Sequence, residues 1–254
     1  MLDATQGSPP AASRWTREVA LLALFYAAYT AGRDVQGSAA VSYTRALSNS
    51  LRLIGVERRL DLFGEESLQR AALSHRWLIE SANVFYGSLH LMATISVLVF
   101  LFRCHRSAYR RARNALATTT AIALIGFVAY PTVPPRLLPS DFGFVDTLAR
   151  FGGSWSFDSG AVSKLSNQYA AMPSLHFAWA LWVAISVAKV ARHRTTRILA
   201  CIYPLLTFAV IIVTANHFVL DAVFGAAIVA FGFALTARRS HRLPEQVGSR
   251  ASVA

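Results

Sequence analysis

The chain has 254 residues, of which 54% are hydrophobic and only 15% charged, and its formal net charge is +12. This composition is too apolar for an ordinary soluble domain, and the length allows several membrane-spanning helices. The basic residues do not indicate a nucleic-acid-binding protein, because they are divided among short segments between apolar runs rather than gathered on one soluble face. We therefore expect an integral membrane protein without a nucleic-acid partner.

Six apolar runs, each near the ~20 residues that cross a bilayer core as a helix, predict an all-α fold with six transmembrane helices. They form one membrane domain over residues 14–239, with flexible cytoplasmic tails at residues 1–13 and 240–254. The first run lacks a convincing cleavage site and is interpreted as a retained span. The expected spans are residues 17–32, 82–102, 114–133, 172–190, 197–215 and 217–236.

Three basic clusters set the expected topology in the cell membrane. They follow the second, fourth and sixth spans, so the positive-inside rule places these segments and the N-terminus in the cytoplasm. The other loops are then extracytoplasmic. The clusters are Arg103, Arg106, Arg110, Arg111 and Arg113; Lys189, Arg192, Arg194 and Arg197; and Arg238, Arg239 and Arg242.

Two segments between the spans have the mixed composition of interfacial helices. Residues 57–73 alternate leucines with charged side chains, which predicts a helix on the outer leaflet with a break at Gly64. Residues 144–151 form a second, shorter amphipathic segment. Both are expected on the extracytoplasmic side.

Two histidines stand at the starts of apolar runs that enter the membrane from this side. The segments are Ala171-Met172-Pro173-Ser174-Leu175-His176 and Asn216-His217-Phe218-Val219-Leu220-Asp221. His217 and Asp221 are separated by one helical turn, so the carboxylate can orient the imidazole. His176 could then act from the opposite side of a reacting phosphorus or carbonyl. Either histidine alone could be an interfacial residue. Asp221, in contrast, is an ionisable residue inside an apolar run, and its burial there costs free energy unless the carboxylate has a partner.

Several polar residues are candidates for substrate binding near the histidines. Arg136, at the proline-rich exit of the third span, can bind two phosphate oxygens or anchor the helix end at the headgroups. Ser174 could donate to a phosphate or cap the fourth span. Asn167 and Gln168 precede this turn and could line the site.

A polar stripe on the second span also points toward the interior of the bundle. Asn83, Tyr86 and His90 recur every three to four residues and share one helix face. They could line a substrate cavity or join helices by hydrogen bonds. Cys104 and Cys201 are too few for a metal site and are not expected to form a disulfide, so we expect no metal and no cofactor.

These motifs carry a family resemblance. Ala171-Met172-Pro173-Ser174-Leu175-His176, followed by His217-x-x-x-Asp221-x-x-x-Gly225, resembles the paired motifs of the type 2 phosphatidic acid phosphatase (PAP2) superfamily. The chain is most similar to the branch of inositol phosphorylceramide synthases and sphingomyelin synthases, over about residues 57–236. The resemblance implies metal-independent transfer of a phosphate-containing group through a phosphohistidine. It assigns His217 as the nucleophile, Asp221 as its orienting partner and His176 as the acid for the leaving oxygen.

The chain departs from the phosphatase branch at two cation positions. The family's Lys-x6-Arg-Pro motif has Ala129 in place of the lysine, and Leu137 follows Arg136. Val210 and Ile211 occupy the positions of a Ser-Arg pair. Fewer cations disfavour hydrolysis of a phosphomonoester dianion relative to reaction of a phosphodiester monoanion.

The expected function is therefore an inositol-phosphotransferase-like reaction at the extracytoplasmic face. A phospholipid or polyprenyl-phosphate donor would pass its head group to a hydroxyl of a lipid or glycan acceptor. One alternative is a phosphatase acting on phosphatidic acid or on polyprenyl phosphate or diphosphate. Another is a non-catalytic lipid carrier or scramblase, which would not require His176, His217 and Asp221 to converge.

Overall fold

The structure, a computed structural model, describes residues 42–152 and 168–240 and the isolated positions 16, 20 and 27. Within these residues the fold is helical, and the only extended pairing is an isolated parallel bridge between Thr132 and Ala170. The all-α prediction is therefore confirmed. The first predicted span, residues 17–32, lies outside the described residues except at two isolated positions, as do the N-terminal tail and the C-terminal tail from residue 241.

Four described helices are long and apolar enough to cross a membrane. The predicted span at residues 172–190 is a shorter apolar helix, α8 (Leu175–Val190). The outer faces of the longer helices carry exposed large apolar side chains, including Ile125, Leu205 and Phe231, as lipid contact requires. The longer helices are α4 (Arg76–Cys104), α5 (Arg106–Ala129), α9 (Arg194–Val213) and α10 (Val219–Ser240).

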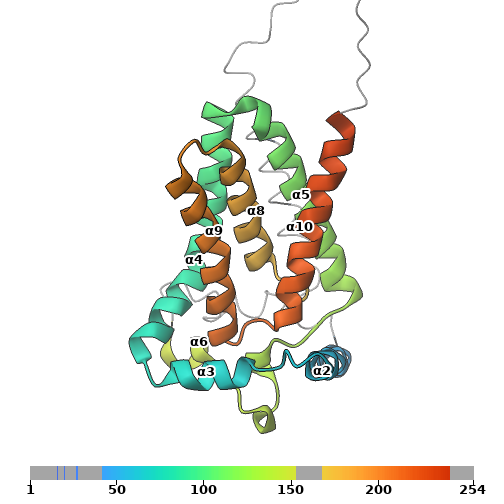
Figure 1. Cartoon of the computed structure of the whole chain (residues 1–254). Coiled ribbons are helices and arrows are strands. Elements are labelled where there is room, and N and C mark those ends of the chain that lie inside the picture. Colours follow the sequence, from blue (N-terminus) through green and yellow to red (C-terminus); the bar gives the residue numbers. More distant parts are fainter. Residues whose placement is uncertain (1–15, 17–19, 21–26, 28–41, 153–167, 241–254) are drawn as a thin grey trace, which may run out of the picture.

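Helix α8 lies in the middle of the bundle and packs against α4, α5, α9 and α10 (Figure 1). Its two buried tryptophans fix it to α5. The indole N–H of Trp179 donates to Thr120 Oγ1 at 3.0 Å, and that of Trp182 donates to the Ala112 carbonyl at 2.8 Å. These bonds satisfy the indole donors inside the bundle and set the position of α8, which carries His176.

Two helices lie across the end of the bundle at which α9 ends and α10 begins (Figure 1). They are α2 (Tyr43–Arg59) and α3 (Glu65–Leu73), separated by a turn in which Asp61 has a φ of 54°. The predicted break near Gly64 is confirmed, but the helical region begins earlier than expected. Its placement on the outer leaflet stays a prediction.

Three short helices follow α5, between Pro135 and Phe151. They are η1 (Pro135–Leu137), η2 (Ser140–Phe142) and α6 (Thr147–Phe151). The Asp146 carboxylate caps α6 by accepting from the N–H groups of Leu148 and Ala149, each at 3.1 Å. This helix lies within the second segment for which the sequence predicts an amphipathic helix.

Two glycines let the turn before α8 fit closely between neighbouring helices. A Cβ at Gly225 of α10 would lie 2.7 Å from the Ser174 carbonyl oxygen, and one at Gly126 of α5 would lie 2.7 Å from Pro173 Cδ. In addition, the Ser174 N–H donates to the Asp221 carbonyl at 2.9 Å. The turn that leads to His176 is therefore held against the first turn of α10.

Candidate active site

His217 and Asp221 form a buried pair at the start of α10. The Nδ1 of His217 lies 3.2 Å from Asp221 Oδ2, and the two residues are 4% and 0% exposed. The same Asp221 oxygen accepts from the Phe218 N–H at 3.0 Å. An acceptor at Nδ1 favours the tautomer that carries its proton there, which leaves the Nε2 lone pair available. No partner for Nε2 occurs among the described residues.

His217 itself precedes α10, which begins at Val219. The four-residue spacing therefore produces the expected contact through a capping turn rather than through a continuous helix. Asp221 lies in the first turn of α10, where a negative charge is favoured by the helix dipole. The backbone thus holds the carboxylate, and the carboxylate in turn holds the imidazole.

His176 reaches the same place from the first turn of α8. The centroids of its ring and that of His217 are 5.8 Å apart. Tyr86 of α4 stacks on His176, with 4.0 Å between the ring centroids, and the ring centroid of His90 lies 4.2 Å from that of His176. The helices α4 and α8 and the turn before α10 therefore supply adjacent rings, so the structure brings the two predicted catalytic histidines together with Tyr86 and His90.

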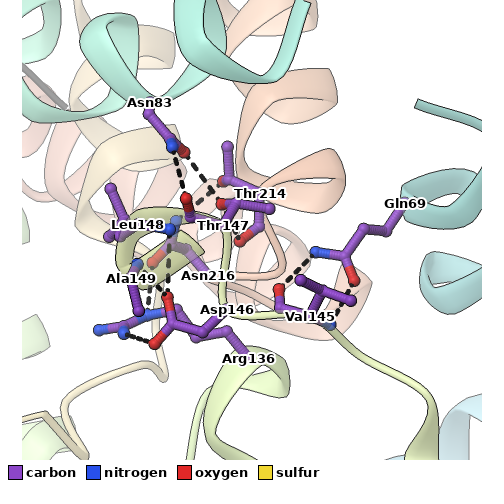
Figure 2. Close-up of polar contacts among 10 residues, drawn as sticks. All are labelled: Gln69, Asn83, Arg136, Val145, Asp146, Thr147, Leu148, Ala149, Thr214 and Asn216. Carbon is purple, nitrogen blue, oxygen red and sulfur yellow. Dashed lines mark hydrogen bonds and ion pairs between the residues drawn. The ribbon is translucent and has the colours of Figure 1, made fainter. Parts of the chain in front are cut away.

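Asn83, the third residue of the polar stripe, has a different place. Its side-chain N–H donates to the Thr147 carbonyl at 3.0 Å, and its oxygen accepts from the Thr147 hydroxyl at 2.9 Å (Figure 2). Its side-chain nitrogen also donates to the Gly152 carbonyl at 2.9 Å. Asn83 therefore joins α4 to α6. Of the two alternatives for the polar stripe, a substrate cavity or hydrogen bonds between helices, Asn83 follows the second.

Arg136 lies beside the residue that precedes His217. Its Nε donates to Asn216 Oδ1 at 3.0 Å, and its Nη1 lies 2.9 Å from Asp146 Oδ2 (Figure 2). Its backbone N–H donates to the Ala215 carbonyl at 2.8 Å. The guanidinium, with its side chain only 10% exposed, is therefore partly neutralised by Asp146. Its role in phosphate binding stays a prediction.

Ser174 is fully buried and caps α8 by accepting from the Phe177 N–H at 3.3 Å. This contact agrees with the capping interpretation, and phosphate binding by its hydroxyl stays a prediction. Asn167, the remaining predicted binding residue, lies outside the described residues.

Two acidic residues near the site have no role in the sequence prediction. Glu57 of α2 and Glu65 of α3 are both fully buried, and each accepts a hydrogen bond from the start of α10. The spacing of Ala46, Ser50, Leu53 and Glu57 puts Glu57 on the buried face of α2, a signal that was available in the sequence. Residues 57–73 are predicted to form an interfacial helix on the outer leaflet, and this prediction gives Glu57 no place in the site.

Comparison with known proteins gives one positive result. The family model of the PAP2 superfamily matches residues 51–235 of the chain, a range that includes both histidines, Asp221, Glu57 and Glu65. No curated protein and no solved structure gives a significant match.

Proposed function

The chain belongs to the PAP2 superfamily, and from that membership we propose that it is a membrane phosphotransferase. It moves a phosphate-containing head group from a lipid donor to a hydroxyl of a lipid or glycan acceptor. The reaction resembles that of the inositol phosphorylceramide synthase and sphingomyelin synthase branch. We place the site at the extracytoplasmic face of the cell membrane, on the basis of the basic clusters in the sequence.

The proposed reaction has two steps that use the same residues. His217 Nε2 attacks phosphorus and forms a phosphorus–nitrogen bond while the bond to the leaving oxygen breaks. His176 gives that oxygen a proton, and Asp221 stabilises the positive charge on the His217 ring. In the second step the acceptor hydroxyl attacks phosphorus, passes its proton to His176 and releases His217.

One observation carries this proposal: the arrangement of Asp221, His217 and His176. The carboxylate contacts Nδ1 at 3.2 Å, and the second imidazole lies 5.8 Å away, between ring centroids. A single phosphate group would be in reach of both rings. A non-catalytic carrier or scramblase gives no reason for two histidines from separate helices to meet beside a buried carboxylate.

The scarcity of cations supports transfer of a phosphodiester over hydrolysis of a phosphomonoester. Apolar Ala129, Val210 and Ile211 stand at the positions of polar or charged family residues. Arg136 is paired with Asp146. A phosphodiester carries one negative charge and needs less compensation than a terminal phosphate dianion. Hydrolysis, with water as the acceptor, is the alternative that superfamily membership also supports.

An apolar groove supports a lipid substrate. A cavity of about 360 Å³ lies between α2, the end of α5 and the start of α10. Leu53 and Val56 of α2 line it together with Leu220 and Phe224 of α10, and Arg52 contributes a cation. An acyl or prenyl chain would bury apolar surface here, next to Met172 in the turn that leads to His176.

The test is a transfer assay with purified protein. A phosphodiester lipid labelled in its phosphate should pass the label to an added acceptor faster than phosphatidic acid releases inorganic phosphate, and EDTA should not change the rate. Acid-labile phosphate on the protein should be trapped in wild type and be absent from His217→Ala. His193→Ala, which removes an exposed histidine outside the site, is the matched control. Release of inorganic phosphate from phosphatidic acid that is faster than transfer would favour the phosphatase alternative. No reaction with either substrate would contradict the proposal that the chain is an enzyme.

A further inference from the structure

Three carboxyl groups meet at the start of α10. The N–H groups of Phe218, Val219 and Leu220 donate to different acids: Asp221 at 3.0 Å, Glu65 at 3.0 Å and Glu57 at 2.7 Å, respectively. The first N–H groups of a helix have no partner within the helix, and negative charge is favourable there. Glu57 and Glu65 come from α2 and α3, so both helices are attached to the residues that directly follow His217.

The two glutamates also lie close together, because they accept from the N–H groups of adjacent residues. Both are 0% exposed, and the Oε2 atom of each has no N–H or O–H donor among the described residues. The two carboxyl groups interact, and the neighbouring Glu65 raises the pKa of Glu57. Two ionised carboxylates could not bond to each other, because neither has a donor. One proton between them would give both Oε2 atoms a partner.

The surroundings of Glu57 favour its protonated form. Burial has the largest effect, and together with the nearby charges of Glu65 and Asp221 it raises the pKa of Glu57 from 4.5 to about 9, although the Leu220 N–H acts in the opposite direction. The groups that face Glu57 are thus Glu65 from α3 and Asp221 from α10. At neutral pH this carboxyl group is uncharged.

We propose that Glu57 and Glu65 share one proton and that this pair positions His217, by holding the start of α10 to α2 and α3. With one proton the pair carries a single negative charge. Without it, two adjacent carboxylates and Asp221 would repel one another in a buried space, and α2 would be pushed away from residues 217–221. Both glutamates are positioning residues, since each acts on His217 through the backbone of α10. The inference rests on the proposed function in assigning His217 as the nucleophile.

The first test needs no substrate. In purified wild-type protein we expect the infrared carbonyl band of a protonated carboxyl group at pH 7, lost as the pH rises through about 9. Glu57→Gln should remove this band. Glu66→Gln is the matched control, because Glu66 neighbours Glu65 but pairs with the exposed Arg70. A wild-type spectrum identical to that of Glu57→Gln at pH 7 would overturn the shared proton.

Thermal unfolding gives a second test without substrate. Because the pKa of Glu57 is about 9 in the folded chain and near 4.5 when it is exposed, the folded state binds more protons between these values. The contribution of Glu57 to the free energy of unfolding is therefore complete below pH 4.5 and is lost as the pH rises through 9. Tm should fall with pH over this range in wild type and in Glu66→Gln, and should fall less in Glu57→Gln. An equal fall in all three proteins would contradict the inference.

Amide substitutions test the positioning role. A glutamine at either position can take the place of the protonated carboxyl group. Its NH2 group donates to the remaining carboxylate, while its oxygen accepts from the backbone N–H of α10. Glu57→Gln and Glu65→Gln should each keep kcat within about threefold of wild type, whereas Glu57→Ala should lose about tenfold or more because it leaves buried groups without partners. The double glutamine variant places two donors face to face and should lose more than both single changes combined.

These outcomes separate the inference from the proposed function. Glu57→Gln as impaired as Glu57→Ala, or a double variant whose loss is merely additive, would overturn the positioning role. Absence of transfer by wild type, together with the expected infrared and Tm behaviour, would overturn the proposed function and leave the shared proton supported.

Discussion

Arg136 forms an ion pair with Asp146, with 2.9 Å between Nη1 and Oδ2, while its Nε donates to Asn216, the residue before His217. The planar guanidinium can make both contacts at once because its donors lie in a fixed fork. A lysine offers a single ammonium and cannot reproduce this geometry. The pair therefore connects the loop after α5 to the residue that precedes His217.

We expect Arg136→Lys to lower kcat/KM by about tenfold or more, since the charge is kept but the two-sided contact is lost. Asp146→Asn should have a smaller effect, because asparagine still caps α6 and only the ion pair is weakened. Steady-state kinetics on the phosphodiester lipid measures both. Arg150→Lys, an exposed arginine on α6, is the control. A wild-type rate for Arg136→Lys would show that any cation suffices at this position.

A second prediction separates the two histidines by leaving group. If His176 only protonates the departing oxygen, its contribution of about 10² to 10⁴ in rate should apply to an alkoxide and largely disappear for a nitrophenolate. His176→Ala should thus be severely impaired on the lipid and recover partly on a nitrophenyl phosphodiester. His217→Ala should be inactive on both substrates, because no phosphoenzyme forms. Recovery of His217→Ala in place of His176→Ala would mean that the roles are exchanged.

A third prediction concerns the contact between α10 and the turn before α8. Gly225→Ala should lower the free energy of unfolding by about 1–3 kcal/mol, because the new methyl group would meet the Ser174 carbonyl, a backbone atom that cannot move aside freely. Gly55→Ala is the matched control, since nothing lies within 4 Å of a Cβ at Gly55 of α2. Chemical unfolding measures the free energy of unfolding of both variants. Equal values for Gly225→Ala and Gly55→Ala would show that the Ser174 backbone can move away from the new methyl group.

Sidedness supplies the fourth prediction. Cys104 and Cys201 are exposed, so both must first be replaced by alanine. In that background Asp141→Cys should react with an impermeant thiol reagent on intact cells, and Ser107→Cys should not, because the basic cluster around Ser107 is expected in the cytoplasm. The reverse labelling pattern would place the site on the cytoplasmic side.

The contact of His217 with Asp221 and the proximity of His176 were predictable from sequence, because short-range spacing and alternating spans determine them. The boundaries of the helices were less predictable. The apolar run at residues 172–190 includes the turn at Met172 and Pro173, and α8 starts only after the Ser174 cap. Hydropathy records how apolar a residue is and does not separate a buried turn from a helix.

The environments of Arg136 and Glu57 could not be obtained in this way. Asp146 is brought back to Arg136 by the short helices η1 and η2, which no periodic pattern predicts. The spacing on α2 assigns Glu57 to its buried face, but it does not give the partner there, because the bond from the Leu220 N–H joins residues 163 positions apart. Such long-range packing overrides the local preference of glutamate for the surface.

The length of α8 has a consequence for the depth of the reaction. Its 16 residues span about 24 Å, less than the ~30 Å thickness of a bilayer core. If its basic end lies at the membrane surface, His176 lies several ångströms below the opposite headgroup plane. In the proposed reaction, a phosphate drawn to this depth would lose part of its hydration, and the attraction between Asp221 and a positive charge forming on the His217 ring would strengthen in the lower dielectric. In the proposed reaction, water would be the scarcer acceptor at this depth, and a lipid-borne hydroxyl would already lie in the layer of the phosphohistidine.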